Sequence, residues 1–446
     1  MRPQAWPLLL LLSWPPPLQA HKWDQYHNHQ QMVDFLHNLH AQYPNTSYLY
    51  SIGNSVQDRQ LLVIAISAEK PGEHVLGRPE VKYVANIHGD ESVGREMLLR
   101  LAHDLLSSNH SDVHQLLKHA RVHLLPSMNP DGFEMSIAKC YSAFGRENAN
   151  DVDLNRNFPD ERRRDSSLRL EPETMAVIKW LDDIPFLLSG SIHGGALVVN
   201  YPYDTWRDSA NQTRSARLKR SHKWMAIYSA SPDDDVFRHI SFAYAKTHPE
   251  LDPALPMPDR EGCNKHFSKG IINGNAWYSV VGSMQDYNYL RAGVLEVTIE
   301  MSCCKYPPAD QLPEFWHKNK RSLIHYLLQV NRGIRGRVLN ENGEGVVTEL
   351  YIKYRSIPFS STKDGEFWRI LLPGNYTLQV TNGTTDELLL ELPVTVPQKG
   401  YSEYTVTLPP ILTARAHLNA LSHTLYSIVM VVILDSVLAH TLLTKI

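Results

Sequence analysis

Residues 81–106 read VKYVANIHGDESVGREMLLRLAHDLL, and this stretch decides the fold class. Residues 81–87 form a short, largely apolar run, which is typical of a strand that is buried on both faces. Over residues 93–106 the apolar side chains recur at helical spacing. Between the two lies His88-Gly89-Asp90-Glu91. A buried strand that leads directly into a helix predicts an α/β fold, in which functional residues gather at the carboxyl ends of the strands.

Further strands and helices alternate on both sides of this stretch. Apolar runs predict strands at residues 61–66, 121–126, 186–192 and 294–301. Helical spacing predicts helices at residues 31–43, 173–181 and 315–330. Such an alternation predicts a mixed, mostly parallel sheet with helices on both faces. We expect this α/β unit to extend over residues 21–330.

The pattern changes at Gly333, and residues 331–408 are predicted to form a second, all-β unit. Short strands are expected around Val338 and Val346 and at residues 350–354, 367–372, 376–380 and 404–408. Turn signals such as Glu341-Asn342-Gly343 and Lys363-Asp364-Gly365 separate them. Short strands at this spacing predict a small β-sandwich.

The composition excludes some classes of function. The chain of 446 residues has 44 Lys and Arg against 47 Asp and Glu, a net charge of −3, so it lacks the basic excess that general nucleic-acid binding requires. We therefore expect no nucleic-acid partner. Hydrophobic residues make up 43% of the chain, an ordinary globular value. The four Cys allow at most two disulfides, in three possible pairings, so the fold must depend on its core.

Residues 1–20 have the features of a secretory signal peptide. A single basic residue, Arg2, precedes a short apolar run around residues 8–12, and we expect cleavage after Ala20. The run is too short to span a bilayer. Because Asn-x-Ser/Thr sequons are glycosylated in secreted proteins, the sequence predicts glycosylation at five sites, namely Asn45, Asn109, Asn211, Asn375 and Asn382.

The C-terminal tail, residues 409–446, contains a second apolar stretch at residues 425–443. A stretch that ends where the chain ends is typical of the signal for a GPI lipid anchor, which would hold the protein on the extracellular side of the cell membrane. Ala414 and Ala416 are candidate attachment residues. Asp435 and His440 interrupt the apolar stretch. The alternative is an amphipathic helix on a fully soluble, secreted protein.

His88-x-x-Glu91 offers two metal ligands where a buried strand leads into a helix. His193 lies at the end of the strand predicted at residues 186–192 and could be a third ligand. Two close ligands, a distant third and one open position describe a catalytic zinc site. The alternative is a chance match, because the chain contains 22 His.

Eight blocks of sequence identify a family resemblance. They read HGDESVGRE, PSMNPDGFE, GREN, DLNRNFPD, HGGALV, PDDDVF, GSMQDYNY and VTIEMSCCKYP. Together they resemble the zinc metallocarboxypeptidases, and within them the regulatory branch that acts on basic C-terminal residues. The β-sandwich resembles the transthyretin-like domain of that branch. The resemblance implies one Zn²⁺ per chain and favours the disulfides Cys140–Cys304 and Cys263–Cys303.

The resemblance also implies roles for individual residues. His88, Glu91 and His193 match the zinc ligands, and Glu300 matches the general base. Glu296 lies on the same strand face, and the residue pattern alone does not separate it from Glu300. Arg146 matches the residue that stabilises the oxyanion. Asn155 and Arg156 match the dock for the free α-carboxylate, which suits the planar, two-pronged guanidinium. Tyr278 matches the tyrosine that closes over the substrate.

Substrate specificity is expected in the pocket for the C-terminal side chain. Gln285 matches the pocket floor, which is not acidic in the regulatory branch. Asp204 would supply the acidic charge, which favours Arg or Lys over apolar side chains. Asp286 neighbours Gln285, but we expect its side chain to point elsewhere. The basic run after Asp204 is interpreted as a solvated loop; it comprises Arg207, Arg214, Arg217, Lys219, Arg220 and Lys223.

The sequence therefore predicts a zinc exopeptidase that removes C-terminal Arg or Lys from extracellular peptides and proteins. One alternative is a catalytically inactive binding module on the same fold, but every expected ligand and the base are present. A second is an amide hydrolase for small N-acyl amino acids, which need not carry the β-sandwich or DLNRNFPD. The segment of residues 205–230 is longer and more basic than in the family pattern and could partly cover the active site.

Overall fold

The computed structural model describes residues 22–161, 163, 168–207, 227–254, 263, 267, 269–382, 387–408 and 410. The predicted signal peptide, the sequon at Asn211, the basic run beyond Arg207 and nearly all of the predicted anchor signal lie outside these residues. Within them, no helix is both long enough and apolar enough to cross a membrane.

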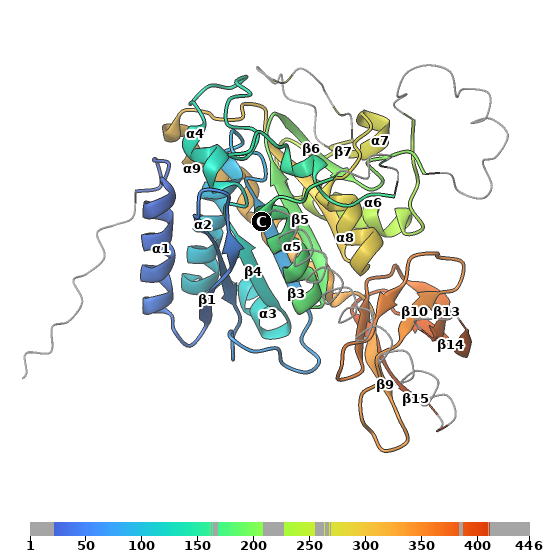
Figure 1. The fold of residues 1–446 in the computed structure, drawn as a ribbon. Helices are drawn as coiled ribbons and strands as arrows, with labels where there is room; N and C mark the ends of the chain where they lie inside the picture. Colours follow the sequence, from blue (N-terminus) through green and yellow to red (C-terminus); the bar gives the residue numbers. More distant parts are fainter. Residues whose placement is uncertain are drawn as a thin grey trace, which may run out of the picture.

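The α/β unit is built on an eight-stranded sheet with strand order β1-β2-β4-β3-β5-β8-β6-β7 (Figure 1). Its middle strands β4, β3, β5 and β8 are parallel to one another, whereas β1, β2 and β6 join through antiparallel pairs. The sheet is thus mixed, as predicted. The strands are β1 Ser47–Asn54, β2 Gln60–Ile66, β3 Glu80–Ala85, β4 Arg121–Leu125, β5 Phe186–His193, β6 Ala196–Tyr201, β7 Ile271–Asn273 and β8 Leu295–Ser302.

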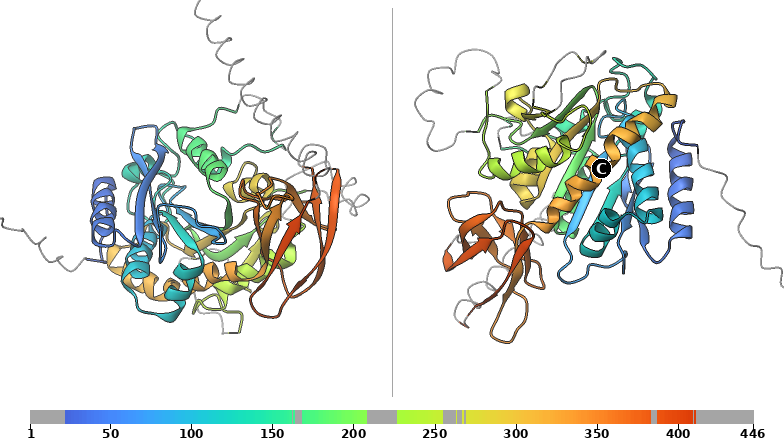
Figure 2. Two further views of the ribbon diagram at one scale, coloured as in Figure 1. Left: turned by 90° about the horizontal axis from the view of Figure 1, so that it is seen from below. Right: turned by 180° about the vertical axis from the view of Figure 1, so that it is seen from behind.

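Helices cover both faces of this sheet. One face carries α1 His29–Gln42, α2 Val93–Ser107, α3 Ser111–His119, α6 Asp234–Ala245 and α9 Leu312–Leu327, whose apolar side chains form one large core with the sheet (Figure 2). The opposite face carries α5 Pro172–Asp183 and α8 Met284–Ala292, over a smaller core. Every residue of β3, β4, β5 and β8 is buried, so their sequences are largely apolar, and the charged residues they carry, such as Lys82 and Glu296, are paired inside the structure. Two short helices, α4 Pro130–Met135 and α7 Gly274–Trp277, lie at the edge of the sheet where β3, β5 and β8 end.

The C-terminal unit is a sandwich of two small sheets. The first has strand order β11-β10-β13-β14 and the second β12-β9-β15. Its strands are β9 Gly333–Leu339, β10 Glu349–Ile352, β11 Phe359–Ser360, β12 Glu366–Arg369, β13 Gly374–Thr381, β14 Leu388–Val396 and β15 Tyr401–Thr407. Apolar side chains from both sheets fill the space between them. Val346 is buried in this core but lies outside the strands, so the strand predicted around it is wrong.

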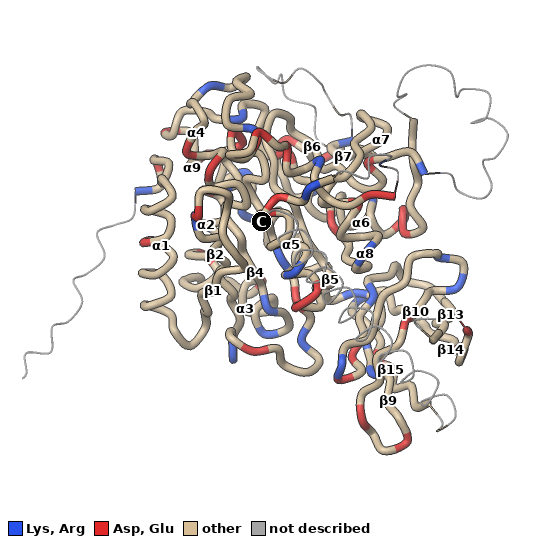
Figure 3. The backbone as a smooth tube through the Cα atoms, in the orientation of Figure 1, with Lys and Arg blue, Asp and Glu red and all other residues tan. Residues whose placement is uncertain are grey.

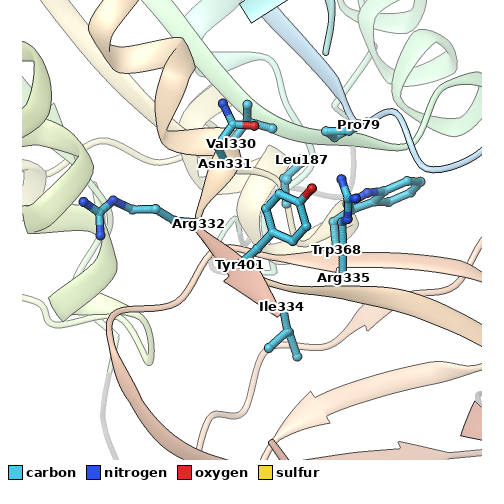
Figure 4. A pocket seen from close by; sticks show the side chains of 9 residues that line it. All are labelled: Pro79, Leu187, Val330, Asn331, Arg332, Ile334, Arg335, Trp368 and Tyr401. Carbon is cyan, nitrogen blue, oxygen red and sulfur yellow. The ribbon is translucent and has the colours of Figure 1, made fainter. Parts of the chain in front are cut away.

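Charged groups join the two units. Arg355 of the sandwich donates to Asp233 of the α/β unit at 2.6 Å, and Arg369 reaches the other oxygen of the same carboxylate. His74 lies 2.8 Å from Glu366 across the junction. A small crevice separates Leu187 and Pro79 from Trp368 and Tyr401 (Figure 4). In the view of Figure 3, acidic and basic residues are interspersed over both units.

Two disulfides, Cys140–Cys304 and Cys263–Cys303, have the pairing that the family resemblance implies. Among the predicted glycosylation sites, Asn45, Asn109 and Asn375 are exposed. Asn382 is only 4% exposed, so a glycan could not leave its side chain without displacing it. Residues 383–386, which follow Asn382, lie outside the described residues, and glycosylation at Asn382 stays a prediction.

Candidate active site

Three ligand side chains meet at the carboxyl ends of β3 and β5. His88 and Glu91 follow β3, and His193 is the last residue of β5. The Nδ1 atoms of His88 and His193 lie 3.0 and 2.9 Å from the two oxygens of Glu91. One ligand atom from each of the three residues lies within 4.8 Å of the others, and all three side chains are buried. Within the described residues this is the one such group of His, Cys, Asp and Glu.

The outer ring nitrogens of the two histidines are held by further side chains. His88 Nε2 lies 3.1 Å from Asp153 Oδ1, and His193 Nε2 lies 3.1 Å from Ser191 Oγ. These contacts turn both Nδ1 atoms toward Glu91, the usual arrangement of an outer partner that orients a metal-ligating His. His88 Nδ1 is buried and makes no hydrogen bond to the protein. Its one close neighbour is the carboxylate of Glu91, at 3.0 Å, which is itself a candidate ligand. A buried nitrogen in this position suits a metal ligand, and two His with one carboxylate suit zinc.

Electrostatics support the same arrangement. Burial alone would raise the pKa of Glu91, but the adjacent His88 and His193 lower it well below its usual range. Burial lowers the pKa of His193, so that its ring stays neutral. Metal binding requires Glu91 as a carboxylate and an unprotonated ring nitrogen on each histidine.

Close backbone packing explains why the turn after β3 contains glycine. A Cβ on Gly89 would lie 2.2 Å from backbone atoms of Gly132 and Phe133. No side chain fits there, so the turn that bears His88 and Glu91 is pressed against α4. This contact explains why residue 89, between the two ligands, is a glycine.

Glu300 and Glu296 are both buried on β8, but their surroundings differ. Glu300 lies opposite His193 in the register of β5 and β8 and lines the cavity beside the three ligands. Its Oε2 has no hydrogen-bond partner, and burial followed by the charge of Glu91 raises its pKa well above the usual range. Glu296 instead accepts hydrogen bonds from Lys82 at 3.1 Å and from Ser189 at 2.5 Å, and all three residues are buried on the middle strands of the sheet. Of the two, only Glu300 can reach a substrate.

A cavity of about 180 Å³ opens beside the three ligands. Arg146, Asn155, Tyr278, Glu300 and Asp204 all line it. Arg146 donates to Asp153 at 2.9 Å and lies 3.4 Å from Glu91, and these carboxylates raise its pKa although burial opposes them. Tyr278 also lines the cavity, and its side chain is 45% exposed.

Arg156 and Gln285 are not among the residues that line the cavity, but each contacts one that does. Arg156 Nη1 donates to the carbonyl of Asn155 at 2.9 Å, and its side chain is 35% exposed. Gln285 is 1% exposed and donates to Asp204 Oδ1 at 3.0 Å. Gln285 therefore holds the carboxylate of Asp204 rather than forming the floor itself.

Asp204 is the buried acid of the cavity. It is 4% exposed and accepts from Asn200 at 3.3 Å as well as from Gln285. Burial raises its pKa to about 6. A Cβ on Gly274, at the start of α7, would lie 2.0 Å from Asp204 Oδ1, so glycine makes the space that the carboxylate occupies. Sequence reasoning missed Gly274, because nothing in the sequence near it points to the pocket.

Asp286 points away from the cavity, as expected. Its Oδ1 accepts the backbone N–H of Asp204 at 3.0 Å, so it fixes the turn that presents Asp204. Arg207 was interpreted as part of a solvated loop, and this is wrong: its guanidinium pairs with Asp160 at 3.2 Å, and the side chain is only 10% exposed. Its burial beside acidic groups gave no signal in the sequence.

Two further residues at the site had no predicted role. Asp153 begins the DLNRNFPD block and joins His88 to Arg146. Lys305 lines the cavity and donates to Asp90 at 2.8 Å, with Glu91 at 3.3 Å. A Cβ on Gly195 would lie 3.3 Å from its side chain, which crosses the turn after His193. Both residues lie inside the quoted blocks, which was the only available signal.

Comparisons with known proteins agree with this geometry. The model of the family described as zinc carboxypeptidase matches residues 32–322. Carboxypeptidase M of Mus musculus is 42% identical over 381 residues, which cover 84% of this chain and 82% of that protein. The carboxypeptidase N catalytic chain of Rattus norvegicus is 36% identical over 428 residues, 90% of this chain and 86% of that one. Carboxypeptidase D of Mus musculus is 43% identical over 361 residues, which are 80% of this chain but 25% of that protein.

Solved structures show the same fold at low identity. The crystal structure of thrombin activatable fibrinolysis inhibitor matches with a TM-score of 0.54 at 17% identity, over 69% of this chain and 75% of that one. Carboxypeptidase A from Helicoverpa armigera matches with a TM-score of 0.53 at 19% identity, over 68% of this chain and 73% of that one.

Proposed function

Because the chain belongs to the zinc carboxypeptidase family, we propose that it removes C-terminal Arg or Lys from extracellular peptides and proteins. The observation that carries the choice of substrate is Asp204, a nearly buried carboxylate on the wall of the cavity that also contains Glu300 and the three ligands. A basic side chain that enters this cavity gains a charged partner there. An apolar side chain would leave the carboxylate buried and unpaired, which costs free energy.

The ligand set fits zinc, with His88, Glu91 and His193 as its protein ligands. When bound, zinc supplies a Lewis acid that polarises the scissile carbonyl and the attacking water. We propose that Glu300 accepts the proton of that water and delivers it to the leaving amine. The raised pKa of Glu300 suits a group that must both take and return a proton near neutral pH.

The remaining cavity residues would bind and orient the substrate. Arg146, already aligned by Asp153, can donate to the oxygen of the scissile carbonyl as negative charge develops there. Asn155 and Arg156 would receive the free α-carboxylate, and this contact restricts cleavage to the end of a chain. Tyr278 at the mouth would close over the bound residue and exclude water.

For location, we propose secretion after cleavage near Ala20 and attachment to the outer face of the cell membrane through a GPI anchor. The supporting observations are the apolar stretch at residues 425–443 and the small residues Ala414 and Ala416 before it. The likeness to carboxypeptidase M over most of both chains is consistent with one common organisation.

The experiment that tests the function is hydrolysis of three blocked dipeptides that end in Arg, Lys or Leu. We expect release of Arg and Lys, much slower release of Leu, and loss of all three activities with a zinc chelator. Addition of zinc should restore them. Equal release of Leu and Arg would contradict the proposed specificity, and activity that resists the chelator would contradict the metal mechanism.

A further inference from the structure

A loop beside the candidate active site exposes large apolar side chains. Residues 136–146 connect α4 to Arg146, and within them Ile137 is 41% exposed, Phe144 62% and Tyr141 68%. Single exposed apolar residues are common, but a group of three on one short loop is typical of a contact surface. We call these three residues the apolar lip.

The loop is fixed rigidly to the turn that bears the metal ligands. Gly145 has a φ of 86°, and a Cβ there would lie 2.4 Å from the carbonyl oxygen of Gly132. Gly132 in turn packs against Gly89, between His88 and Glu91. These backbone-to-backbone contacts pack the loop, α4 and the metal-binding turn closely against one another.

The other side of the loop is tied to β8. Cys140 forms a disulfide with Cys304, and its carbonyl accepts the N–H of Lys305 at 3.3 Å. Lys305 and Arg146, one from each side of this connection, both line the cavity. The lip therefore stands beside the mouth of the cavity, and Figure 1 shows the segment after α4 at the same end of the sheet as α7.

Short-range hydrogen bonds hold the backbone of the lip. Arg146 N donates to Ala143 O at 3.1 Å, and Phe144 N donates to Ser142 Oγ at 3.1 Å. A ligand that binds a backbone already ordered in this way meets a smaller entropy cost. The exposed side chains thus form a preorganised surface.

The size of the cavity indicates what the lip would contact. At about 180 Å³ it is smaller than the usual pocket for a drug-sized ligand, so it takes the terminal residue of a substrate and little more. The rest of the peptide must leave through the mouth, past Arg146 on one side or Tyr278 on the other. The residues of the apolar lip do not line the cavity, but they precede Arg146, which does, on the same short loop.

We propose that the apolar lip binds apolar and aromatic side chains of the substrate on the N-terminal side of the cleaved bond. This inference rests on the proposed function, since it assumes a peptide whose C-terminal residue occupies the cavity. It narrows the substrate class to peptides in which an apolar segment precedes the basic terminal residue.

The test uses two blocked pentapeptides and one blocked dipeptide that all end in Ala-Arg. One pentapeptide has Phe-Leu-Phe before Ala-Arg, and the other has Ser-Gln-Ser. We expect the apolar pentapeptide to be cleaved with about tenfold higher kcat/KM, mainly through KM, because one large side chain leaves water. The double variant Tyr141→Ser, Phe144→Ser should remove this advantage, and the apolar pentapeptide should lose about tenfold more than the dipeptide does.

Tyr354→Ser is the matched control, because it removes an aromatic side chain that is 96% exposed on the sandwich. It should leave the ratio between the pentapeptides unchanged. Equal cleavage of both pentapeptides by the wild type would overturn the inference, as would a double variant that keeps the preference. Failure of the wild type to cleave the Ala-Arg dipeptide would instead contradict the proposed function. If the double variant fails to fold, the comparison is repeated with the single variants Tyr141→Ser and Phe144→Ser.

Discussion

Replacing Asp204 by Asn changes the charge of the specificity pocket and little else. The two side chains have nearly the same shape, and Asn can still accept hydrogen bonds from Asn200 and Gln285. The three metal ligands and Arg146 make no hydrogen bond or ion pair with Asp204 among the described contacts. The variant should therefore alter selectivity and leave the metal centre intact.

The magnitude follows from the burial of Asp204. At 4% exposure, water cannot replace the lost charge, so the cation of an Arg or Lys substrate would be buried without a partner. Loss of one member of a buried, hydrogen-bonded charge pair costs about 2–5 kcal/mol. Because each 1.4 kcal/mol is a factor of ten, we expect kcat/KM for Arg and Lys to fall by about 30- to 4,000-fold, with 10²–10³-fold as the middle of that range. Cleavage of a C-terminal Leu should fall far less or rise.

The pH dependence gives a second measure of the same group. The pKa of Asp204 is raised to about 6, so the carboxylate is charged above that pH and neutral below it. The ratio of Arg to Leu cleavage should therefore decrease as the pH falls through about 6. Taking the ratio cancels effects on zinc binding and on Glu300, which act on both substrates. In Asp204→Asn the ratio should not change with pH in this range.

The same pKa makes a prediction for stability with a definite sign. The folded-state pKa of about 6 lies above the ordinary value of 3.8, so the folded protein holds this proton more tightly than the unfolded chain. Stability from this group is thus highest at low pH and is lost as the pH rises from about 4 to about 6. At pH 7 the cost is about 3 kcal/mol. Asp204→Asn should be more stable than the wild type at pH 7, by up to that amount.

The assay compares blocked dipeptides ending in Arg, Lys and Leu on both proteins between pH 5 and 8, with thermal unfolding at pH 5 and 7. Zinc content is measured for each preparation. An unchanged ratio of Arg to Leu cleavage in Asp204→Asn would refute the reasoning. A lower ratio together with lost zinc would show that the variant had damaged the metal centre, and the charge argument would then have to be rejected as the explanation.

Four other substitutions test the rest of the site, and a deletion tests the anchor. His193→Ala should lose most bound zinc by metal analysis, and full zinc content would contradict its role as a ligand. Glu300→Gln should keep zinc and lower kcat by about 10²–10⁴-fold. Glu296→Gln should instead lower the free energy of unfolding, by about 3–5 kcal/mol, because it leaves the charge of Lys82 uncompensated. The opposite result for the two variants would contradict the roles assigned to these glutamates. Gly274→Ala should lower the ratio of Arg to Leu cleavage about tenfold or more, because its Cβ would lie 2.0 Å from the Asp204 carboxylate. An unchanged ratio would show that the pocket can relax. Deletion of residues 421–446 should release active enzyme from cells into the medium, and equal release of the full chain without lipid would contradict the anchor.

Most strands that are buried on both faces were predictable, but β6 was missed although every one of its residues is buried, and the edge strands were missed as well. The apolar runs of β2, β3, β4, β5 and β8 gave strands within one or two residues of their observed bounds. β1, at the edge of the sheet, alternates partly exposed residues and was missed. β7 has only three residues, too few for a periodic signal. In the sandwich, β14 Leu388–Val396 carries a proline and mostly exposed residues, and it was missed for the same reason as β1.

Within the site, residue identity could be predicted but residue environment could not. The quoted blocks contain Asp153 and Lys305, yet their contacts with His88 and Asp90 depend on segments far apart in the chain. Gln285 was expected to form the pocket floor, whereas it supports Asp204 from behind. Arg207 shows the same limit, since a charge run read along the chain gives no information about which of its members is buried against carboxylates.

The two glutamates of β8 show what kind of information was absent. Residues 296 and 300 lie on the same face of the strand, because side chains alternate with a period of two. Four residues at about 3.3 Å each separate them by about 13 Å along the strand. That distance takes Glu296 under the middle of the sheet, where Lys82 from β3 neutralises it, and takes Glu300 to the carboxyl end beside His193. Periodicity determines the face of the sheet on which a side chain lies, but not its depth, which is its distance from the carboxyl end of the sheet. Depth depends on the stagger of neighbouring strands, and here it separates a carboxylate that holds the sheet together from one that faces the substrate.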